Sequence, residues 1–271
     1  MSADTTYEVI AVRYGTRTST KAEIYLNYST YGEPDEPLGM DYYCWVARNA
    51  TRTVVIDTGF GPEGGARRRR TTLVPPVAAL ARLGIDAATV RQVIVTHAHY
   101  DHIGNLAAFP AAEVIIARRE FEFWTGPYAR RQQFAWSTES AELAHLNDVH
   151  RQGRLTAVEG TYAVAPGIEL LTVGGHTPGQ VIVLVAVEGG GQAVLASDAV
   201  HYYEEIERDR PFAFVADLEA MYRGFDLLKE ITAEPGRVLV PGHDPEVMGR
   251  FAPLDGVPLD GAPAGFAVRV G

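Results

Sequence analysis

The sequence predicts a layered α/β fold, in which strands and helices alternate along the chain. Short apolar runs rich in β-branched residues recur throughout, and several are separated by helical segments. The 271 residues are 46% hydrophobic and 21% charged, which is typical of a globular protein with a substantial core. We expect one domain over residues 1–271, because neither an internal repeat nor a linker rich in Pro, Gly or Ser divides the chain.

The amino-terminal third predicts strands and one helix. The strands are expected at Tyr7–Tyr14, Tyr42–Ala47 and Thr53–Ile56, with breaks rich in Gly and Pro between them. The apolar run Val74–Leu83 predicts a helix, with two prolines in its first turn and Gly84 as its stop.

The following segments continue the alternation of strand and helix. Strands are expected at Gln92–Thr96, Glu113–Ala117, Glu169–Val173, Val181–Val187, Ala193–Ala196 and Arg237–Val240, and helices at Arg118–Trp124 and Ser137–Arg151. The pattern gives no course for residues 125–136. The clearest helix follows a possible cap at Asp217, and its apolar stripe comprises Leu218, Met221, Tyr222, Phe225, Leu228 and Ile231.

Charge and composition exclude several classes of function. The 24 basic and 34 acidic residues give a net charge of −10, which disfavours nucleic acid as a partner. No apolar run is long enough for a membrane helix. The single cysteine, Cys44, and the absence of a signal-like start predict a cytoplasmic protein. The sequence leaves open whether the chain forms a homodimer.

The segment from His97 to His102 carries the strongest chemical signal. His97, His99, Asp101 and His102 are four potential metal ligands within six positions, directly after the apolar strand ending near Val95. Imidazole and carboxylate together suit Zn²⁺ and its divalent neighbours. Burying these groups side by side without a ligand would leave each in need of a polar partner.

Three further polar residues follow predicted strands in the same way. They are His176, Asp198 and His243, and each lies in a turn that contains Gly or Ser. With the four ligands of the first segment, they make five histidines and two aspartates. Seven ligands exceed the needs of one tetrahedral or five-coordinate ion, so the sequence favours two metal ions that share a carboxylate.

The sequence resembles the metallo-β-lactamase superfamily from about Cys44 to Phe251. The landmarks appear in order as Val55 to Gly59, His97 to His102, Gly175 to Gly179, Ser197 to Ala199 and Pro241 to Asp244. The resemblance implies an αβ/βα four-layer sandwich, with two central mixed β-sheets flanked by helices. It also implies that His97, His99 and His176 bind the first metal, that Asp101, His102 and His243 bind the second, and that Asp198 bridges them. Asp57 would support the site, although a plain turn aspartate is an equally good interpretation.

Several further segments resemble the N-acyl homoserine lactonase-like branch of this superfamily: Leu83 to Ile85, Val93 to His102, Gly104-Asn105, Phe109-Pro110, the Glu120 region, Gly175 to Gly179 and Pro241 to Pro245. True β-lactamases typically have a Cys ligand where this chain has Asp198, diiron redox members usually carry Glu in the histidine cluster, and RNA-processing branches favour basic surfaces. The resemblance implies a dinuclear metal-dependent hydrolase that opens a lactone or similar cyclic ester with a hydroxide shared by the metals, most simply Zn²⁺, with Fe, Mn or Co as alternatives. Asp101 would shuttle a proton.

One position departs from the lactonase pattern. Lactonases of this branch usually have Tyr three residues after the bridging Asp, whereas this chain has His201, followed by Tyr202. Either side chain could stabilise the oxyanion of the substrate, and the sequence does not choose.

Two other functions stay open at this stage. A thioesterase of the glyoxalase II kind uses the same ligands, although it normally has a larger helical region at its carboxy terminus. A non-catalytic metal-binding or sensor protein is the third hypothesis. The run Arg67–Arg70 could bind an anion or could simply be solvated, and His145 and His150 are expected to be ordinary surface residues.

Overall fold

The structure is a computed structural model that describes residues 5–254 and 265–270. Its first sheet has the strand order β13-β14-β1-β2-β3-β5-β6-β7, with β4 paired to the side of β1. These strands are β1 (Glu8–Thr20), β2 (Pro37–Arg48), β3 (Thr53–Ile56), β4 (Thr71–Thr72), β5 (Gln92–Val95), β6 (Glu113–Ala117), β7 (Leu155–Val158), β13 (Ala252–Pro253) and β14 (Ala267–Arg269).

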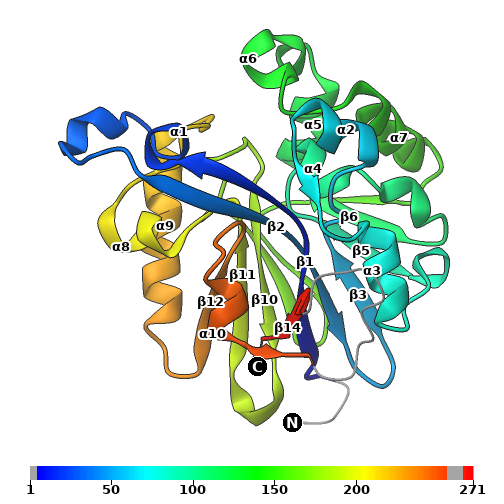
Figure 1. The fold of residues 1–271 in the computed structure, drawn as a ribbon. Helices are drawn as coiled ribbons and strands as arrows, with labels where there is room; N and C mark the ends of the chain where they lie inside the picture. The colour runs from blue at the N-terminus through cyan, green and yellow to red at the C-terminus, as the bar shows by residue number, and fades with distance from the viewer. Residues whose placement is uncertain (1–4, 255–264, 271) are drawn as a thin grey trace.

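A second mixed sheet packs against the first. Its strands are β8 (Thr161–Ala165), β9 (Ile168–Thr172), β10 (Val181–Ala186), β11 (Gln192–Ser197) and β12 (Arg237–Pro241). Their order is β12-β11-β10-β9-β8, with β11 and β12 parallel and the other pairs antiparallel. Figure 1 shows the two sheets side by side, with helices on both outer faces.

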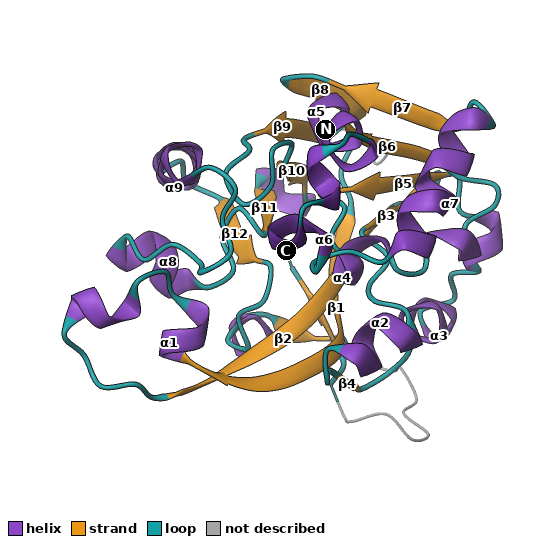
Figure 2. Cartoon of the chain, turned by 90° about the horizontal axis from the view of Figure 1, so that it is seen from above, coloured by secondary structure: helices purple, strands orange, loops and turns teal. Residues whose placement is uncertain are grey.

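The helices complete a four-layer arrangement. They are α1 (Lys21–Ile24), α2 (Pro62–Arg67), α3 (Pro76–Arg82), α4 (Tyr100–Ile103), α5 (Arg118–Thr125), α6 (Gln132–Ala135), α7 (Ser140–Arg151), α8 (Tyr203–Arg208), α9 (Leu218–Thr232) and α10 (Val247–Arg250). Helices α3, α5 and α7 lie on the outer side of the first sheet, and α9 lies on the outer side of the second (Figures 1 and 2).

Successive side chains of each strand point to opposite faces of its sheet, so one strand contributes to two hydrophobic cores. Val93 and Val95 of β5 pack in the cluster that contains residues of α3 and α7, whereas Ile94 packs in the cluster between the sheets. In the same way, Leu195 of β11 faces the first sheet and Val194 packs with Phe225 of α9. Sheets buried on both faces therefore explain why these strands are almost continuously apolar.

The expected layered architecture is confirmed, with differences at element ends and in weakly patterned segments. The helix expected from Val74 begins at Pro76, because a residue before proline disfavours helical backbone. Asp217 caps α9 by accepting a hydrogen bond from the backbone N–H of Ala220. The undefined segment 125–136 forms a 3₁₀ turn at Tyr128–Arg130 and then α6. Strands β7 and β8 were not predicted.

Candidate metal centre

The predicted ligands follow strand ends that meet at one edge of the two sheets. Strand β5 ends at Val95, and the chain then passes through His97 to His99, which is the N-cap residue of α4. Asp101 and His102 lie in the single turn of α4. The carboxyl ends of parallel strands lie at the same edge of a sheet. The short turn after β5 therefore places the side chains of His97, His99, Asp101 and His102 together at that edge.

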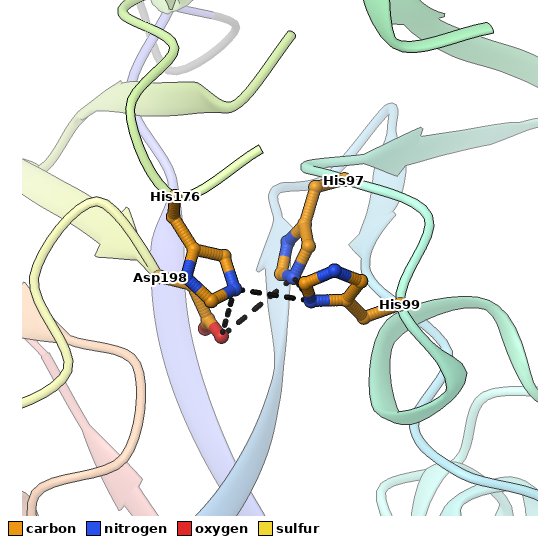
Figure 3. A group of neighbouring side chains, drawn as sticks. All are labelled: His97, His99, His176 and Asp198. Atoms are coloured by element: carbon orange, nitrogen blue, oxygen red, sulfur yellow. Dashed lines mark hydrogen bonds and ion pairs between the residues drawn. The ribbon is translucent and has the colours of Figure 1, made fainter. Parts of the chain in front are cut away.

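The first group of ligands consists of His97, His99, His176 and Asp198, whose candidate ligand atoms all lie within 4.8 Å of one another. Figure 3 shows these side chains pointing toward one another, with His97 and His99 opposite His176 and Asp198. Nδ1 of His99 is 3.0 Å from Nε2 of His97 and 3.0 Å from Nε2 of His176. All four residues are buried.

The second group consists of Asp101, His102 and His243, which are also buried and equally close together. The carboxylate of Asp198 lies between the two groups. Its Oδ2 is 3.3 Å from Nε2 of His176, and its Oδ1 is 3.3 Å from Nε2 of His102 and 3.1 Å from Nε2 of His243. A carboxylate in this position presents one oxygen to each group.

A glycine lets the ends of β11 and β12 approach closely enough for this arrangement. A Cβ at Gly242 would lie 2.7 Å from the carbonyl carbon of Ser197 and 2.8 Å from Oδ1 of Asp198. Such contacts are too short for any side chain, so Gly242 allows His243 to reach the Asp198 carboxylate.

Burial and mutual charge set the protonation of these residues. Burial and the neighbouring imidazoles hold the pKa of His97 and His99 well below the usual range and lower the pKa of His176 to about 3. Burial alone would raise the pKa of Asp198, but the imidazoles of His243, His102 and His201 hold it well below its usual range. The neutral imidazoles of His97, His99 and His176 beside an ionised carboxylate are the forms that bind cations. Burial alone would lower the pKa of His102, but the carboxylates of Asp198, Asp57 and Asp101 raise it well above its usual range, so this imidazole would release a proton when a cation binds.

Outer hydrogen bonds aim three of the imidazoles. Nδ1 of His102 lies 2.7 Å from Oδ2 of Asp57, Nδ1 of His176 lies 2.9 Å from the carbonyl oxygen of Phe214, and Nδ1 of His243 lies 2.7 Å from that of Asp41. Each bond leaves Nε2 directed at the centre, as is typical of metal-binding histidines. Sequence patterns gave no signal for Phe214 or Asp41.

Glu120, on α5, is a further supporting residue; the sequence placed it in a segment shared with the lactonase-like branch but gave it no role. Its buried carboxylate accepts hydrogen bonds from the backbone N–H groups of Ala98 and Gly179, at 2.9 and 2.8 Å, and from Nε1 of Trp124. Ala98 lies between His97 and His99, and Gly179 closes the turn that carries His176. Glu120 therefore ties together the two loops that form the first ligand group.

His201 and Tyr202 occupy different surroundings. His201 forms a third group of potential ligands with Asp198 and His243, whose candidate ligand atoms also lie within 4.8 Å of one another. Nε2 of His201 is 3.1 Å from Oδ2 of Asp198, its Nδ1 is 3.3 Å from Oε1 of Glu205, and Phe212 stacks on its ring at 3.8 Å. The hydroxyl of Tyr202 donates to the carbonyl of Gly39 at 3.0 Å. Both residues are buried, and neither lines the cavity described next.

A cavity of about 450 Å³ opens onto the two ligand groups. His99, Asp101, His176, Asp198 and His243 lie in its wall. The remaining wall combines aromatic side chains with two arginines. They are Tyr42, Tyr100, Trp136, Phe212, Phe214, Arg17 and Arg70, beside Glu23, Met40, Gln133, Ser137 and Ala213. The site can therefore bind a small molecule directly against the ligand groups.

The residues present fit a pair of divalent cations. Nε2 of His102 and Oδ1 of Asp198, which both face the second group, are buried without a hydrogen-bond partner among the residues that the structure describes. Leaving such atoms unpaired is costly, and a cation would satisfy them. Imidazole nitrogen and carboxylate oxygen are the donors that Zn²⁺ and related ions prefer.

Comparison with known families agrees with this geometry. The model of the metallo-beta-lactamase superfamily matches residues 39–243. The chain belongs to this superfamily. Its two mixed sheets between helical layers confirm the four-layer fold that the sequence implied.

Individual relatives of this superfamily member are lactonases by name. An N-acyl homoserine lactonase of a Bacillus species is 28% identical over 227 residues, which cover 79% of this chain and 85% of the relative. The N-acyl homoserine lactonase AttM of Azorhizobium caulinodans is 30% identical over 191 residues, covering 66% and 68%. Among solved structures, a quorum-quenching N-acyl homoserine lactone lactonase gives a TM-score of 0.74 at 24% identity, covering 90% of this chain and 95% of that one.

Among the described residues of this superfamily member, no helix combines the length and the apolar character that a membrane span requires.

His145 and His150 lie on α7, away from both ligand groups, at partly and fully exposed positions. Within the run Arg67–Arg70, Arg67 and Arg68 form ion pairs with Glu139, and Arg70 enters the cavity wall.

Proposed function

We propose that this chain is a dinuclear metal-dependent hydrolase that opens a lactone ring, of the N-acyl homoserine lactone kind. The observation that carries the proposal is the Asp198 carboxylate, which lies between two complete ligand groups in the wall of one cavity. The names of the relatives, which are N-acyl homoserine lactonases, support the choice of substrate.

In this proposal the ligands divide as the sequence implied. His97, His99 and His176 bind the first ion, Asp101, His102 and His243 bind the second, and Asp198 bridges them. Zn²⁺ is the proposed metal, because five imidazoles and two carboxylates form a donor set that it favours, with Fe, Mn or Co as alternatives.

When bound, the two ions would supply Lewis acidity, which polarises the substrate carbonyl and makes an attacking water more acidic. Asp101 lies in the cavity wall, so its carboxylate can accept the proton of the attacking water. The same carboxylate then passes this proton to the ring oxygen as the C–O bond breaks. Phe212, Phe214 and Trp136 cover the apolar part of the substrate and exclude bulk water.

A substrate screen tests the proposed reaction. The zinc-loaded protein should hydrolyse N-acyl homoserine lactones with a higher kcat/KM than aryl esters or acyl thioesters, measured by pH indicator and thiol release. A thioester as the best substrate would assign the chain to the glyoxalase II kind of activity. Hydrolysis of none of these classes by fully loaded protein would refute the proposal and favour a binding or sensor role.

Metal content is the second measurable consequence. Protein purified without chelator, or reconstituted with Zn²⁺, should contain about two ions per chain, because the seven proposed ligands divide into two buried groups and the third group, with His201, shares Asp198 and His243 with them. Elemental analysis by mass spectrometry checks the stoichiometry. A ratio that stays at one after reconstitution would contradict the dinuclear arrangement.

We propose that His201 acts on the site through Asp198. The imidazole lies between the carboxylates of Asp198 and Glu205 and is covered by Phe212, so it holds the bridging carboxylate in place. His201→Ala should weaken metal binding by about ten- to a hundredfold, the usual effect of losing such a partner. Titration of the apoprotein with Zn²⁺ against a competing chelator measures this change.

The same variant separates this role from direct oxyanion stabilisation. In the positioning role, kcat of His201→Ala recovers at saturating Zn²⁺. In the donor role, kcat stays low by about a hundredfold at any metal concentration. Tyr202→Phe is the matched variant, and we expect its kcat to change less than about threefold, because its hydroxyl is occupied by Gly39. A large loss in Tyr202→Phe would reassign the donor to this tyrosine.

A further inference from the structure

Two arginines line the cavity, Arg17 on β1 and Arg70 directly before β4. Arg17 belongs to β1, where it pairs with Met40 of β2, and both side chains line the cavity. Strand β4 pairs with β1 through Thr72 opposite Gly15 and Thr71 opposite Thr16. Continued by one residue, this register places Arg70 opposite Arg17, and Arg70 also lines the cavity.

Neither arginine has a carboxylate within ion-pair distance among the residues that the structure describes. Their neighbours differ in this respect: Arg13, also on β1, pairs with Asp41 at 3.2 Å, and Arg68 pairs with Glu139. Arg17 and Arg70 are both partly buried, so two like charges lie in one cavity wall, where an anionic ligand would reduce their mutual repulsion.

Each guanidinium is held along one edge and keeps further donors available. Nε of Arg70 donates to the hydroxyl of Tyr100 at 2.9 Å and its Nη1 donates to the carbonyl of Arg68 at 2.9 Å. Nε of Arg17 contacts Sδ of Met40 at 3.2 Å. Nη2 of Arg70 and both Nη atoms of Arg17 have no acceptor among the described residues. The cavity wall also contains Glu23, whose Oε2 accepts a hydrogen bond from Oγ of Ser19, and the proposed metal ligands Asp101 and Asp198.

We propose that Arg17 and Arg70 form a subsite for an anionic oxygen group of the substrate, a carboxylate or a phosphate, at a distance from the bond that is hydrolysed. This inference rests on the proposed function, and it narrows the substrate to a lactone that carries an acidic substituent. Guanidinium groups bind such anions through paired, charge-assisted hydrogen bonds. Trp136, Phe212 and Phe214 of the same cavity contact the apolar part of that substrate.

Binding of simple acids to the zinc-loaded protein tests the subsite without catalysis. Isothermal titration calorimetry measures the affinity of each dicarboxylate from succinate to pimelate and of the monocarboxylate of the same length. Both acids can place one carboxylate at the metals, so the difference in affinity reports the contribution of the second carboxylate. The dicarboxylate of the right length should bind about tenfold tighter or more. Phosphonocarboxylates of matching length form the second arm, and whichever series binds tighter identifies the anion. If no member of either series exceeds its monocarboxylate by more than about twofold, the subsite does not exist.

Variants of the two arginines connect the preference to this wall. Arg17→Gln combined with Arg70→Gln should remove the preference for the dianion, and each single substitution should remove part of it, which keeps the test decisive if the double variant fails to fold. Arg69→Gln is the matched control, because Arg69 is exposed in the same run and does not line the cavity, and it should retain the full preference. Zinc content and circular dichroism verify that each variant keeps the site and the fold. An unchanged preference in a folded double variant overturns the assignment.

Steady-state kinetics with two lactones test the same preference on substrates. N-adipoyl homoserine lactone, which ends in a carboxylate, should have about a tenfold higher kcat/KM than N-hexanoyl homoserine lactone, and the double variant should lose this ratio. Hydrolysis of neither lactone would refute the proposed function and leave the calorimetric preference standing. Equal hydrolysis of both, with no calorimetric preference, would refute the subsite alone.

Discussion

Replacing Asp198 by alanine is expected to abolish hydrolysis while the protein stays folded. The carboxylate is within 3.3 Å of Nε2 of His176, His102 and His243, so no other side chain can take its position between the groups. We expect kcat/KM to fall by well over a hundredfold, since loss of a mere outer partner of a ligand already costs up to about that factor. Steady-state kinetics and elemental analysis measure the loss of activity and of metal.

The fold of Asp198→Ala is expected to persist because the cores between the layers do not include this side chain. Circular dichroism and a cooperative urea transition check that point. Asp226→Ala, at an exposed position on α9, removes the same charge and should behave as wild type. Activity close to wild type in folded Asp198→Ala would rule out the bridging role.

Glu120→Gln is expected to destabilise the protein by about 3 kcal/mol, since three buried N–H donors converge on this side chain and each donor left unpaired costs about 1–3 kcal/mol. The wild-type carboxylate accepts from Ala98, Gly179 and Trp124 with both oxygens. An amide has one oxygen, so its NH₂ group would face at least one N–H donor. Urea denaturation of the chelated protein measures the change in the free energy of unfolding without any contribution from bound metal.

Glu122→Gln is the matched control for this substitution. Glu122 lies on the same helix, two residues from Glu120, and is exposed, so its replacement should change the free energy of unfolding by less than about 0.5 kcal/mol. Equal stability of the two variants would show that the hydrogen bonds of Glu120 contribute little to holding the loops together.

That the candidate ligands would lie close together could be predicted from the sequence, because most of them follow an apolar strand. Val93 to Val95 and Val194 to Ala196 are buried on both faces, which produces runs that are easy to recognise, and the turn after each run carries the polar residue. Strands β7 and β8 could not be predicted in this way, because most of their residues are partly or fully exposed. Thr161 to Ala163 are exposed, so β8 shows no alternation of apolar and polar residues.

Local sequence patterns do not predict contacts between residues that are far apart in the chain. Glu120 and Gly179 are 59 positions apart, and His243 is separated by 202 positions from Asp41, whose carbonyl orients it. Arg70 reaches the cavity wall that carries Arg17 because the short strand β4 pairs with β1, and the two residues of β4 form no recognisable pattern. Such contacts arise only when the sheets have packed.

The division of the ligands between the two sheets bears on how such a protein can change over evolutionary time. His97, His99, Asp101 and His102 follow strand β5 of the first sheet, whereas His176, Asp198 and His243 follow strands β9, β11 and β12 of the second. Neither sheet carries a complete set for either proposed ion. Selection for activity therefore also acts on distant residues such as Trp45 and Val183, whose packing holds the two sheets in register. Substitutions there would be tolerated in pairs that conserve volume, and drift in one sheet would constrain drift in the other.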